Sequence, residues 1–171
     1  MIDILNTDIN KMSNLSFDCN CGKHHTLNIH DICIKENAIE ELDRIISPFK
    51  DNKIFVFSDT NTFKAAGKET LNELEKNNYN YKNFVIETRE DILIPNEKVL
   101  GRLFMEMENN TGLIIAIGSG TINDLGKYLS VKTGIPYIIV CTAPSMDGYA
   151  SNGAPLICSG MKISFNATLP Y

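Results

Sequence analysis

A glycine-rich turn between a buried strand and a helix carries the strongest chemical signal in this chain. Residues 112–127 read GLIIAIGSGTINDLGK, so an apolar run leads into Gly118-Ser119-Gly120 and then directly into a stretch of helical period. Glycines let the backbone approach a ligand closely, and the first free N–H groups of a helix, with its dipole, attract a phosphate. The segment therefore predicts a phosphate-binding turn, and a plain tight turn in an α/β domain is the alternative.

The same turn departs from the usual dinucleotide fingerprint. That fingerprint, Gly-x-Gly-x-x-Gly, follows the first strand of its unit, whereas this turn follows a late strand and has Asn123 where the third glycine would fall. Thr121 and Asp124 have the spacing of a capping box, which predicts a well-defined helix start. Three apolar residues are expected to hold the helix against the sheet: Ile122, Leu125 and Leu129.

A second loop, rich in small and polar residues, follows the next apolar run. Residues 141–151 read CTAPSMDGYAS and combine hydroxyl side chains with a single carboxylate, Asp147. Ligands of open α/β sheets bind at the carboxyl ends of the strands, so the hydroxyls would hydrogen-bond a cofactor and Asp147 a substrate hydroxyl. The alternative is a capped turn, in which Ser145 and Asp147 bond to local backbone N–H groups. Spacing alone does not choose between these interpretations.

Soft metal ligands cluster near the start of the chain, where Cys19, Cys21, His24 and His25 fall within seven residues. Zinc is one interpretation of this cluster. Structural zinc sites usually draw two ligand pairs from separated segments, and no second pair follows here. We therefore expect a β-turn around Gly22 in an amino-terminal hairpin, with all five cysteines of the chain reduced.

Strand and helix patterns alternate from Ile54 onward, which predicts an α/β fold with a Rossmann-like parallel sheet and crossover helices. The expected strands are near-continuous apolar runs, as is typical when both sheet faces are covered: residues 53–58, 83–87, 112–117 and 137–141. Two amphipathic helices are expected at residues 61–76 and 97–108. Their predicted buried stripes are Phe63, Ala66, Leu71 and Leu74 in the first, and Leu100, Leu103, Phe104 and Met107 in the second.

The flanking segments complete a single expected domain, residues 1–171. Residues 1–26 form an amino-terminal extension, residues 27–34 are predicted as a strand that could join the sheet, and residues 37–46 as a short helix. Two apolar stretches around Ser159-Gly160 predict a β-hairpin over residues 155–166.

Composition restricts the class of partner. A net charge of −5 without a dense Lys/Arg run argues against nucleic acid. The apolar runs are far shorter than a membrane span, and the first residues carry no signal-peptide pattern, so we expect no membrane association and a cytoplasmic location.

The two loops together resemble the signature loops of the sn-glycerol-1-phosphate dehydrogenases, a branch of the iron-containing alcohol dehydrogenase, glycerol dehydrogenase and dehydroquinate synthase superfamily. The matching segments are GSGTINDLGKY and TAPSMDGYAS, of which SMDGYAS is characteristic of this branch. Residues 17–25, FDCNCGKHH, are similar to the Cys-x-Cys-Gly entry of the bacterial members, and residues 56–63 to their strand ending in Asp. The resemblance covers essentially the whole chain, as the amino-terminal domain of the dehydroquinate synthase-like fold.

The resemblance implies NAD or NADP as cofactor and assigns residues to it. Asp59 would contact the adenosine ribose, although as an N-cap it would have a purely structural role. The phosphate-binding turn would comprise Gly118, Ser119, Gly120, Thr121, Ile122, Asn123 and Asp124. The nicotinamide side would comprise Thr142, Ala143, Pro144, Ser145 and Ser151. Asp147 would bind the glycerol phosphate substrate, and Lys127 and Lys162 could meet its phosphate but are expected as solvated surface residues.

The resemblance also implies a reaction in phospholipid biosynthesis. Members reduce dihydroxyacetone phosphate to sn-glycerol 1-phosphate, and a divalent nickel, zinc or iron ion, held by one Asp and two His of a helical carboxyl-terminal domain, polarises the carbonyl. All three histidines here precede residue 31. We therefore expect that domain to be absent, and these 171 residues to bind nucleotide weakly without turning over.

The implied partners are a dinucleotide and a small phosphorylated triol or ketone, with a homodimer as a possible assembly. Three alternatives stay open at this point: a non-catalytic nucleotide-binding remnant, a glycerol dehydrogenase, or a dehydroquinate synthase-like enzyme.

Overall fold

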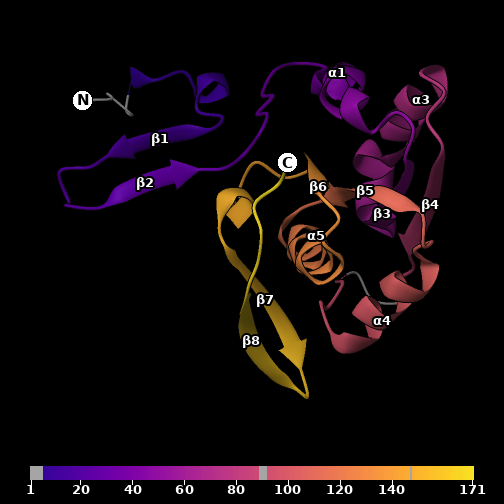
Figure 1. Cartoon of the computed structure of the whole chain (residues 1–171). Coiled ribbons are helices and arrows are strands. Elements are labelled where there is room, and N and C mark those ends of the chain that lie inside the picture. The colour runs from indigo at the N-terminus through magenta and orange to yellow at the C-terminus, as the bar shows by residue number, and fades with distance from the viewer. Residues whose placement is uncertain (1–5, 89–91, 147) are drawn as a thin grey trace.

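A four-stranded parallel sheet forms the centre of the computed structural model, which describes residues 6–88, 92–146 and 148–171 (Figure 1). Its order is β4-β3-β5-β6, and every neighbouring pair is parallel. The strands are β3 (Lys53–Asp59), β4 (Tyr81–Ile86), β5 (Thr111–Gly118) and β6 (Tyr137–Cys141). The predicted Rossmann-like α/β fold is thus confirmed, with the four strands displaced from their expected bounds by at most two residues.

Helices cover both faces of this sheet, which explains the continuous apolar character of its strands. On one face, Phe55 and Phe57 of β3 pack with α4 (Glu97–Glu106) and α5 (Gly120–Thr133). On the other, Ile54 and Val56 pack with α1 (Leu42–Ile46) and α3 (Lys68–Lys76). Successive side chains of a strand point to opposite faces, so one strand supplies both cores.

The strand order creates a topological switch point. The chain passes from β3 to β4 through α3 on one face, and from β4 to β5 and β5 to β6 through α4 and α5 on the other. The direction of winding therefore reverses between β3 and β5. Ligands of open α/β sheets bind outside the carboxyl ends of the strands at such a point.

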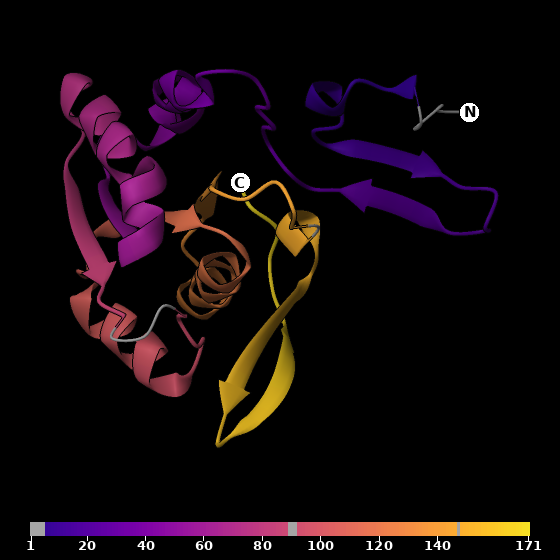
Figure 2. The same cartoon turned by 180° about the vertical axis from the view of Figure 1, so that it is seen from behind.

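One predicted strand is absent. Residues 28–34 lie outside any strand, and only Leu27 of the predicted segment belongs to one, β2 (His24–Leu27). β2 pairs with β1 (Leu15–Asp18) in a separate hairpin that lies beside the main sheet (Figures 1 and 2). The apolar alternation instead marks an extended connector, in which Ile29 is buried and Ile34 is exposed.

The helix predicted at residues 61–76 is broken into three parts. It begins with α2 (Thr60–Thr62), passes through the π-helical turn η5 (Phe63–Gly67) and ends with α3. A Cβ atom at Gly67 would lie 2.2 Å from the Phe63 ring, so only glycine lets this ring lie against the backbone. A π-turn inserts one residue into the helical repeat, and in α3 the buried residues are Thr70 and Leu74.

The other two predicted helices also differ in detail. Residues 37–46 form the 3₁₀ turn η3 (Ala38–Glu41) followed by α1. α4 ends at Glu106, two residues early, and buries Leu100 and Leu103 as expected. The prediction that Phe104 is buried is wrong, because this residue is 39% exposed at the rim of the apolar stripe. None of the helices in the described part of the chain combines the length and apolar character that crossing a bilayer requires.

A second hairpin packs on the outer side of α5. β7 (Gly153–Cys158) and β8 (Met161–Asn166) are antiparallel, and their turn residues Ser159 and Gly160 both have positive φ, as a type I′ turn requires. Leu156 joins the same core as α5, and the Phe165 ring meets Tyr128 edge-on at 5.1 Å. α5 therefore lies between the sheet and this hairpin (Figures 1 and 2).

Two neighbouring residues of α4 provide a test of this packing. Leu103→Ala should lower the free energy of unfolding by about 2–5 kcal/mol, because Leu103 is fully buried and truncation leaves a cavity. Phe104→Ala is the matched control and should cost clearly less, since its ring is partly solvated. Urea unfolding measures both, and equal losses would contradict the placement of the two side chains.

Candidate functional site

The predicted site residues meet at one edge of the sheet because all four strands point the same way. Asp59, Gly118 and Cys141 end β3, β5 and β6, which are adjacent in the sheet. Ser58 pairs with Ile117, and Gly118 pairs with Cys141. The acidic residue, the glycine turn and the second loop therefore lie side by side, with Asp59 and Gly118 flanking the switch point.

Asp59 has a defined structural role. It is the N-cap of α2, and its Oδ1 atom accepts hydrogen bonds from the backbone N–H groups of Asn61 at 2.8 Å and Thr62 at 2.9 Å. The Thr62 hydroxyl accepts from the Asp59 N–H at 3.1 Å, which completes a capping box. Both backbone N–H groups donate to Oδ1, so neither of these two bonds uses the second carboxylate oxygen, Oδ2.

The helix after the glycine turn starts without a side-chain cap. α5 begins at Gly120 with Ser119 at the N-cap, and the Ser119 side chain makes no capping hydrogen bond. The predicted capping box of Thr121 and Asp124 is therefore wrong, because the helix starts before Thr121 and both residues lie within it. The Asn123 N–H donates to the carbonyl of the N-cap residue Ser119 at 2.9 Å, which is the first hydrogen bond of the helix. An uncapped helix start of this kind favours an anion as the missing partner.

Two residues of the predicted phosphate-binding turn point into the protein. Ile122 is buried in the core between α5 and the sheet. Asn123 is fully buried, donates to the Gly148 carbonyl at 3.3 Å and accepts from the Tyr137 hydroxyl at 3.3 Å. The groups of this turn that a ligand could meet are the backbone N–H groups of the first helical residues and the hydroxyls of the half-buried Ser119 and Thr121.

Glycine is required at Gly118 and is favoured at Gly126, further along the helix. A Cβ atom at Gly118 would lie 2.5 Å from Cβ of Ile122, within the first turn of the helix. A Cβ atom at Gly126 would lie 3.1 Å from Ala116 and from Tyr137, so this glycine lets α5 approach the sheet closely. Gly126 thus provides the close helix–strand packing for which the usual fingerprint employs its third glycine.

The second loop lies across the glycine turn. The Thr142 N–H donates to the Gly118 carbonyl at 3.1 Å, and a Cβ atom at Gly120 would lie 2.5 Å from the Met146 methyl group. Pro144 and Ser145 are exposed, while Ala143 accepts a hydrogen bond from the Tyr149 hydroxyl at 2.9 Å. Asp147, the predicted substrate ligand, lies outside the described residues.

The prediction that Lys127 lies on the surface is wrong. Its side chain is fully buried between α5 and the segment that leads to β7. The ammonium group donates to the Gly148 carbonyl at 2.5 Å, the Ser151 hydroxyl at 2.9 Å and the Gly153 carbonyl at 3.3 Å. These bonds tie the end of the second loop to α5, and they engage Ser151, one of the predicted nicotinamide contacts, within the protein.

The electrostatics around Lys127 reflect its burial. Desolvation lowers the pKa of Lys127, and the nearby Asp124 carboxylate opposes that shift. Burial raises the pKa of Asp124 to about 6, although Lys127 and the exposed Lys162 both act to lower it. With a pKa of about 6, Asp124 is still mostly ionised at neutral pH.

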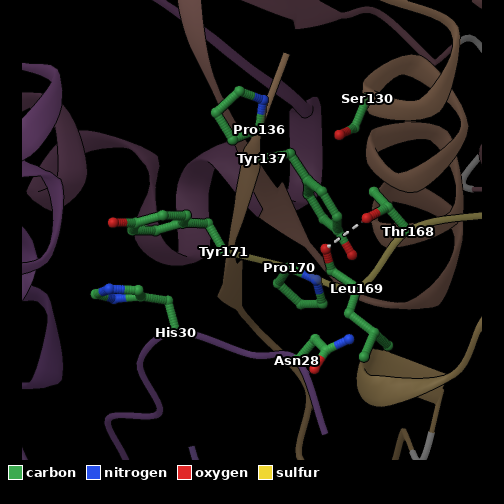
Figure 3. Close-up of a pocket in the computed structure, with 9 residues that line it drawn as sticks. All are labelled: Asn28, His30, Ser130, Pro136, Tyr137, Thr168, Leu169, Pro170 and Tyr171. Atoms are coloured by element: carbon green, nitrogen blue, oxygen red, sulfur yellow. Dashed lines mark hydrogen bonds between the residues drawn. The ribbon is translucent and has the colours of Figure 1, made fainter. Parts of the chain in front are cut away.

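Two cavities flank the sheet. One of about 520 Å³ is lined by Ile86, Asn96, Arg102 and neighbouring residues, at the carboxyl end of β4 beside Asp59. Another of about 250 Å³ lies near the amino end of β6, between Tyr137 and the stacked rings of His30 and Tyr171 (Figure 3). The second cavity is at the opposite end of the sheet from the two loops, whereas the first lies at the same edge as the loops, although none of the predicted site residues lines it.

Comparison with known proteins identifies the family. The sequence profile of the iron-containing alcohol dehydrogenases matches residues 33–171. The chain belongs to this family. It is 30% identical over 167 residues to a glycerol-1-phosphate dehydrogenase, NAD(P)+, of Geobacillus thermodenitrificans, covering 97% of the chain and 41% of the relative. The corresponding protein of Bacillus velezensis is 34% identical over 155 residues, covering 90% of the chain and 39% of the relative. The chain thus spans about 40% of the length of these relatives.

Solved structures agree on the fold. A 1,3-propanediol oxidoreductase matches 80% of the chain with a TM-score of 0.65 and 14% identity, and the chain covers 41% of it. The iron-containing alcohol dehydrogenase of Thermococcus thioreducens matches 80% of the chain with a TM-score of 0.64 and 13% identity, and 42% of it is covered. At this level of identity the likeness establishes the architecture.

The role of Lys127 can be tested against the exposed Lys162. Lys127→Met should lower the free energy of unfolding by about 1–3 kcal/mol and speed amide exchange at residues 148–153, because three hydrogen bonds to that segment are lost. Burial lowers the pKa of Lys127 below 10.5, so the unfolded chain binds more protons there, and the wild-type advantage should grow as pH rises toward that value. Lys162→Met removes the same charge and should leave this segment unchanged. Equal effects of the two substitutions would show that Lys127 does not anchor the loop.

Proposed function

We propose that this chain forms the dinucleotide-binding part of an NAD(P)-dependent glycerol-1-phosphate dehydrogenase, whose substrate is a small phosphorylated ketone or triol. The observation that carries the proposal is the uncapped start of α5, which lies beside Asp59 on one side and the second loop on the other. The relatives are named glycerol-1-phosphate dehydrogenases, NAD(P)+, and the resemblance of the two loops implies dihydroxyacetone phosphate as the ketone that is reduced.

The arrangement suits an extended dinucleotide at the switch point. The N–H groups of Gly120, Thr121 and Ile122 would bind the pyrophosphate, for which the helix dipole adds positive potential. Asp59 would accept hydrogen bonds from the adenosine ribose through Oδ2, beside the 520 Å³ cavity at the end of β4. The second loop, from Thr142 to Ser145, would border the nicotinamide, which supplies the hydride.

The residues at this edge of the sheet would bind and orient the cofactor. They would not bind the metal. In the described part of the chain, three metal-ligating side chains come together in the amino-terminal hairpin, whose two strands form a sheet separate from the main one (Figure 1). The divalent metal of the resembled reaction does not fit the groups at this edge. Asp147 stays a proposed substrate contact on the strength of its place in the SMDGYAS segment.

Adding a negative charge at the start of α5 tests the pyrophosphate site. Thr121→Glu should weaken NADH binding by at least about tenfold, because unit charges about 5 Å apart repel by roughly 3 kcal/mol at an effective dielectric of about 20. A carboxylate in the first turn stabilises a helix, so the loss could not be ascribed to unfolding. NADH fluorescence titration measures the affinity, and urea unfolding measures the stability.

Val131→Glu is the matched control for that experiment. Val131 lies in the last turn of the same helix and is exposed, so the added charge is far from the proposed pyrophosphate. NADH affinity should be unchanged in this variant. If both variants weaken binding alike, or if neither does, the cofactor does not bind at the start of α5.

Asp59 allows its two roles to be separated. Asn is as good an N-cap as Asp, so Asp59→Asn should keep the free energy of unfolding while weakening NADH binding, since an amide accepts less strongly than a carboxylate. The substitution also removes a charge that would repel a 2′-phosphate, so the ratio of NADPH to NADH affinity should rise. Asp59→Ala should lose the cap as well, at about 1 kcal/mol. If Asp59→Asn binds both cofactors as tightly as the wild type does, Asp59 caps the helix and does not contact the cofactor.

A further inference from the structure

The amino-terminal hairpin brings three soft metal ligands together. Between β1 and β2 the loop is closed by hydrogen bonds from Cys19 N–H to the Lys23 carbonyl at 3.0 Å and from Gly22 N–H to the Cys19 carbonyl at 2.9 Å. Gly22 adopts a φ of 80°, which lets the chain turn back tightly. In this loop the two sulfur atoms of Cys19 and Cys21 and a ring nitrogen of His25 all lie within 4.8 Å of one another.

Strand pairing explains why His25, and not His24, joins the cysteines. His25 is directly opposite Phe17 and stacks on it with ring centroids 5.5 Å apart. His24 is on the other face, where it bonds to Ser16 at 2.9 Å and to Asp18 at 2.8 Å. Alternate residues of a strand face opposite ways, so the pairing register alone selects one of the two adjacent histidines.

The chemistry of the cluster favours a bound cation. Sγ of Cys21 and Nε2 of His25 are 3.2 Å apart, and the Cys21 N–H donates to Sγ of Cys19 at 3.5 Å. Thiolates are the form of cysteine that binds metals.

We propose that Cys19, Cys21 and His25 bind one zinc ion. Zinc–sulfur and zinc–nitrogen bonds of about 2.3 and 2.0–2.1 Å place tetrahedral ligand atoms about 3.5–3.8 Å apart, so side-chain movements of about 1 Å complete the site. Two thiolates and one imidazole select zinc over the hard cations magnesium and calcium, which prefer oxygen. Cys21 and His25 are exposed, so water can take the fourth position.

A zinc ion would stabilise a part of the fold that has little other support. A lone two-stranded hairpin is marginally stable in water, and β1 and β2 form a sheet of their own beside the main one (Figures 1 and 2). Because a site of this kind is not preformed in the unfolded chain, binding energy becomes folding energy of the hairpin. The site lies outside residues 33–171, the segment that matches the family profile, and it does not depend on the proposed dehydrogenase activity.

Cobalt(II) titration of the reduced 171-residue chain tests the proposal. Cobalt should bind with one-to-one stoichiometry and give a sulfur-to-cobalt charge-transfer band and intense visible bands typical of a tetrahedral site, and zinc should displace it. Replacing a residue that only hydrogen-bonds to a metal ligand typically lowers metal affinity by about 10–100-fold. Because the ligand itself is lost in Cys19→Ser, Cys21→Ser and His25→Gln, each should lower the affinity by at least about 100-fold. The matched controls are His24→Gln, adjacent in sequence but on the opposite face, and Cys33→Ser, and both should retain the wild-type spectrum.

Amide exchange gives an independent measurement. Zinc should slow exchange at residues 15–27 in the wild type and in His24→Gln, but not in His25→Gln. The proposal is overturned if reduced wild-type chain shows no charge-transfer band, if His24→Gln loses affinity as His25→Gln does, or if only copper(I) binds. A band that survives replacement of both Cys19 and Cys21 would place the metal on other thiols and would equally overturn it.

Discussion

β5 is hydrogen-bonded in parallel to β3 on one side and to β6 on the other, and this pairing determines where the proposed cofactor contacts lie. Because the three strands point the same way, their last residues Asp59, Gly118 and Cys141 fall on one edge. The reversal of winding between β3 and β5 places Asp59 and the start of α5 on the two sides of the switch point. A register shift of one residue would exchange the side chains that face the two cores, so the packing of both cores holds this edge in place.

The second constraint is the burial of α5 on two sides. The sheet covers one side, and the β7-β8 hairpin covers another, so even a lysine near the middle of the helix is enclosed. A buried ammonium group is tolerated only with hydrogen-bond partners, and the segment from Gly148 to Gly153 supplies them. The same contacts that satisfy Lys127 therefore hold the second loop over the glycine turn. Stability and site geometry share these interactions.

The two hairpins of the chain show how much packing matters to a short β-ribbon. β7 and β8 place Leu156 and Phe165 against α5, and their core contacts stabilise the ribbon. β1 and β2 have mostly exposed side chains and form a sheet of their own. A ligand that binds Cys19, Cys21 and His25 would supply by coordination what the other hairpin obtains from burial.

Local sequence determined the strands, the glycine turn and the I′ hairpin, because apolar periodicity and glycine placement are properties of a few neighbouring residues. It also identified the family through the two loops, which the profile match confirms. Only the tertiary structure decided which helix faces were covered: Lys127 became buried because a distant hairpin folds over α5, and Phe104 stayed partly exposed at a rim. The extended segment 28–34 found no strand to pair with, and His25 rather than His24 met the cysteines through the register of β1 and β2. These outcomes depend on contacts between residues far apart in the chain, which spacing along the sequence does not encode.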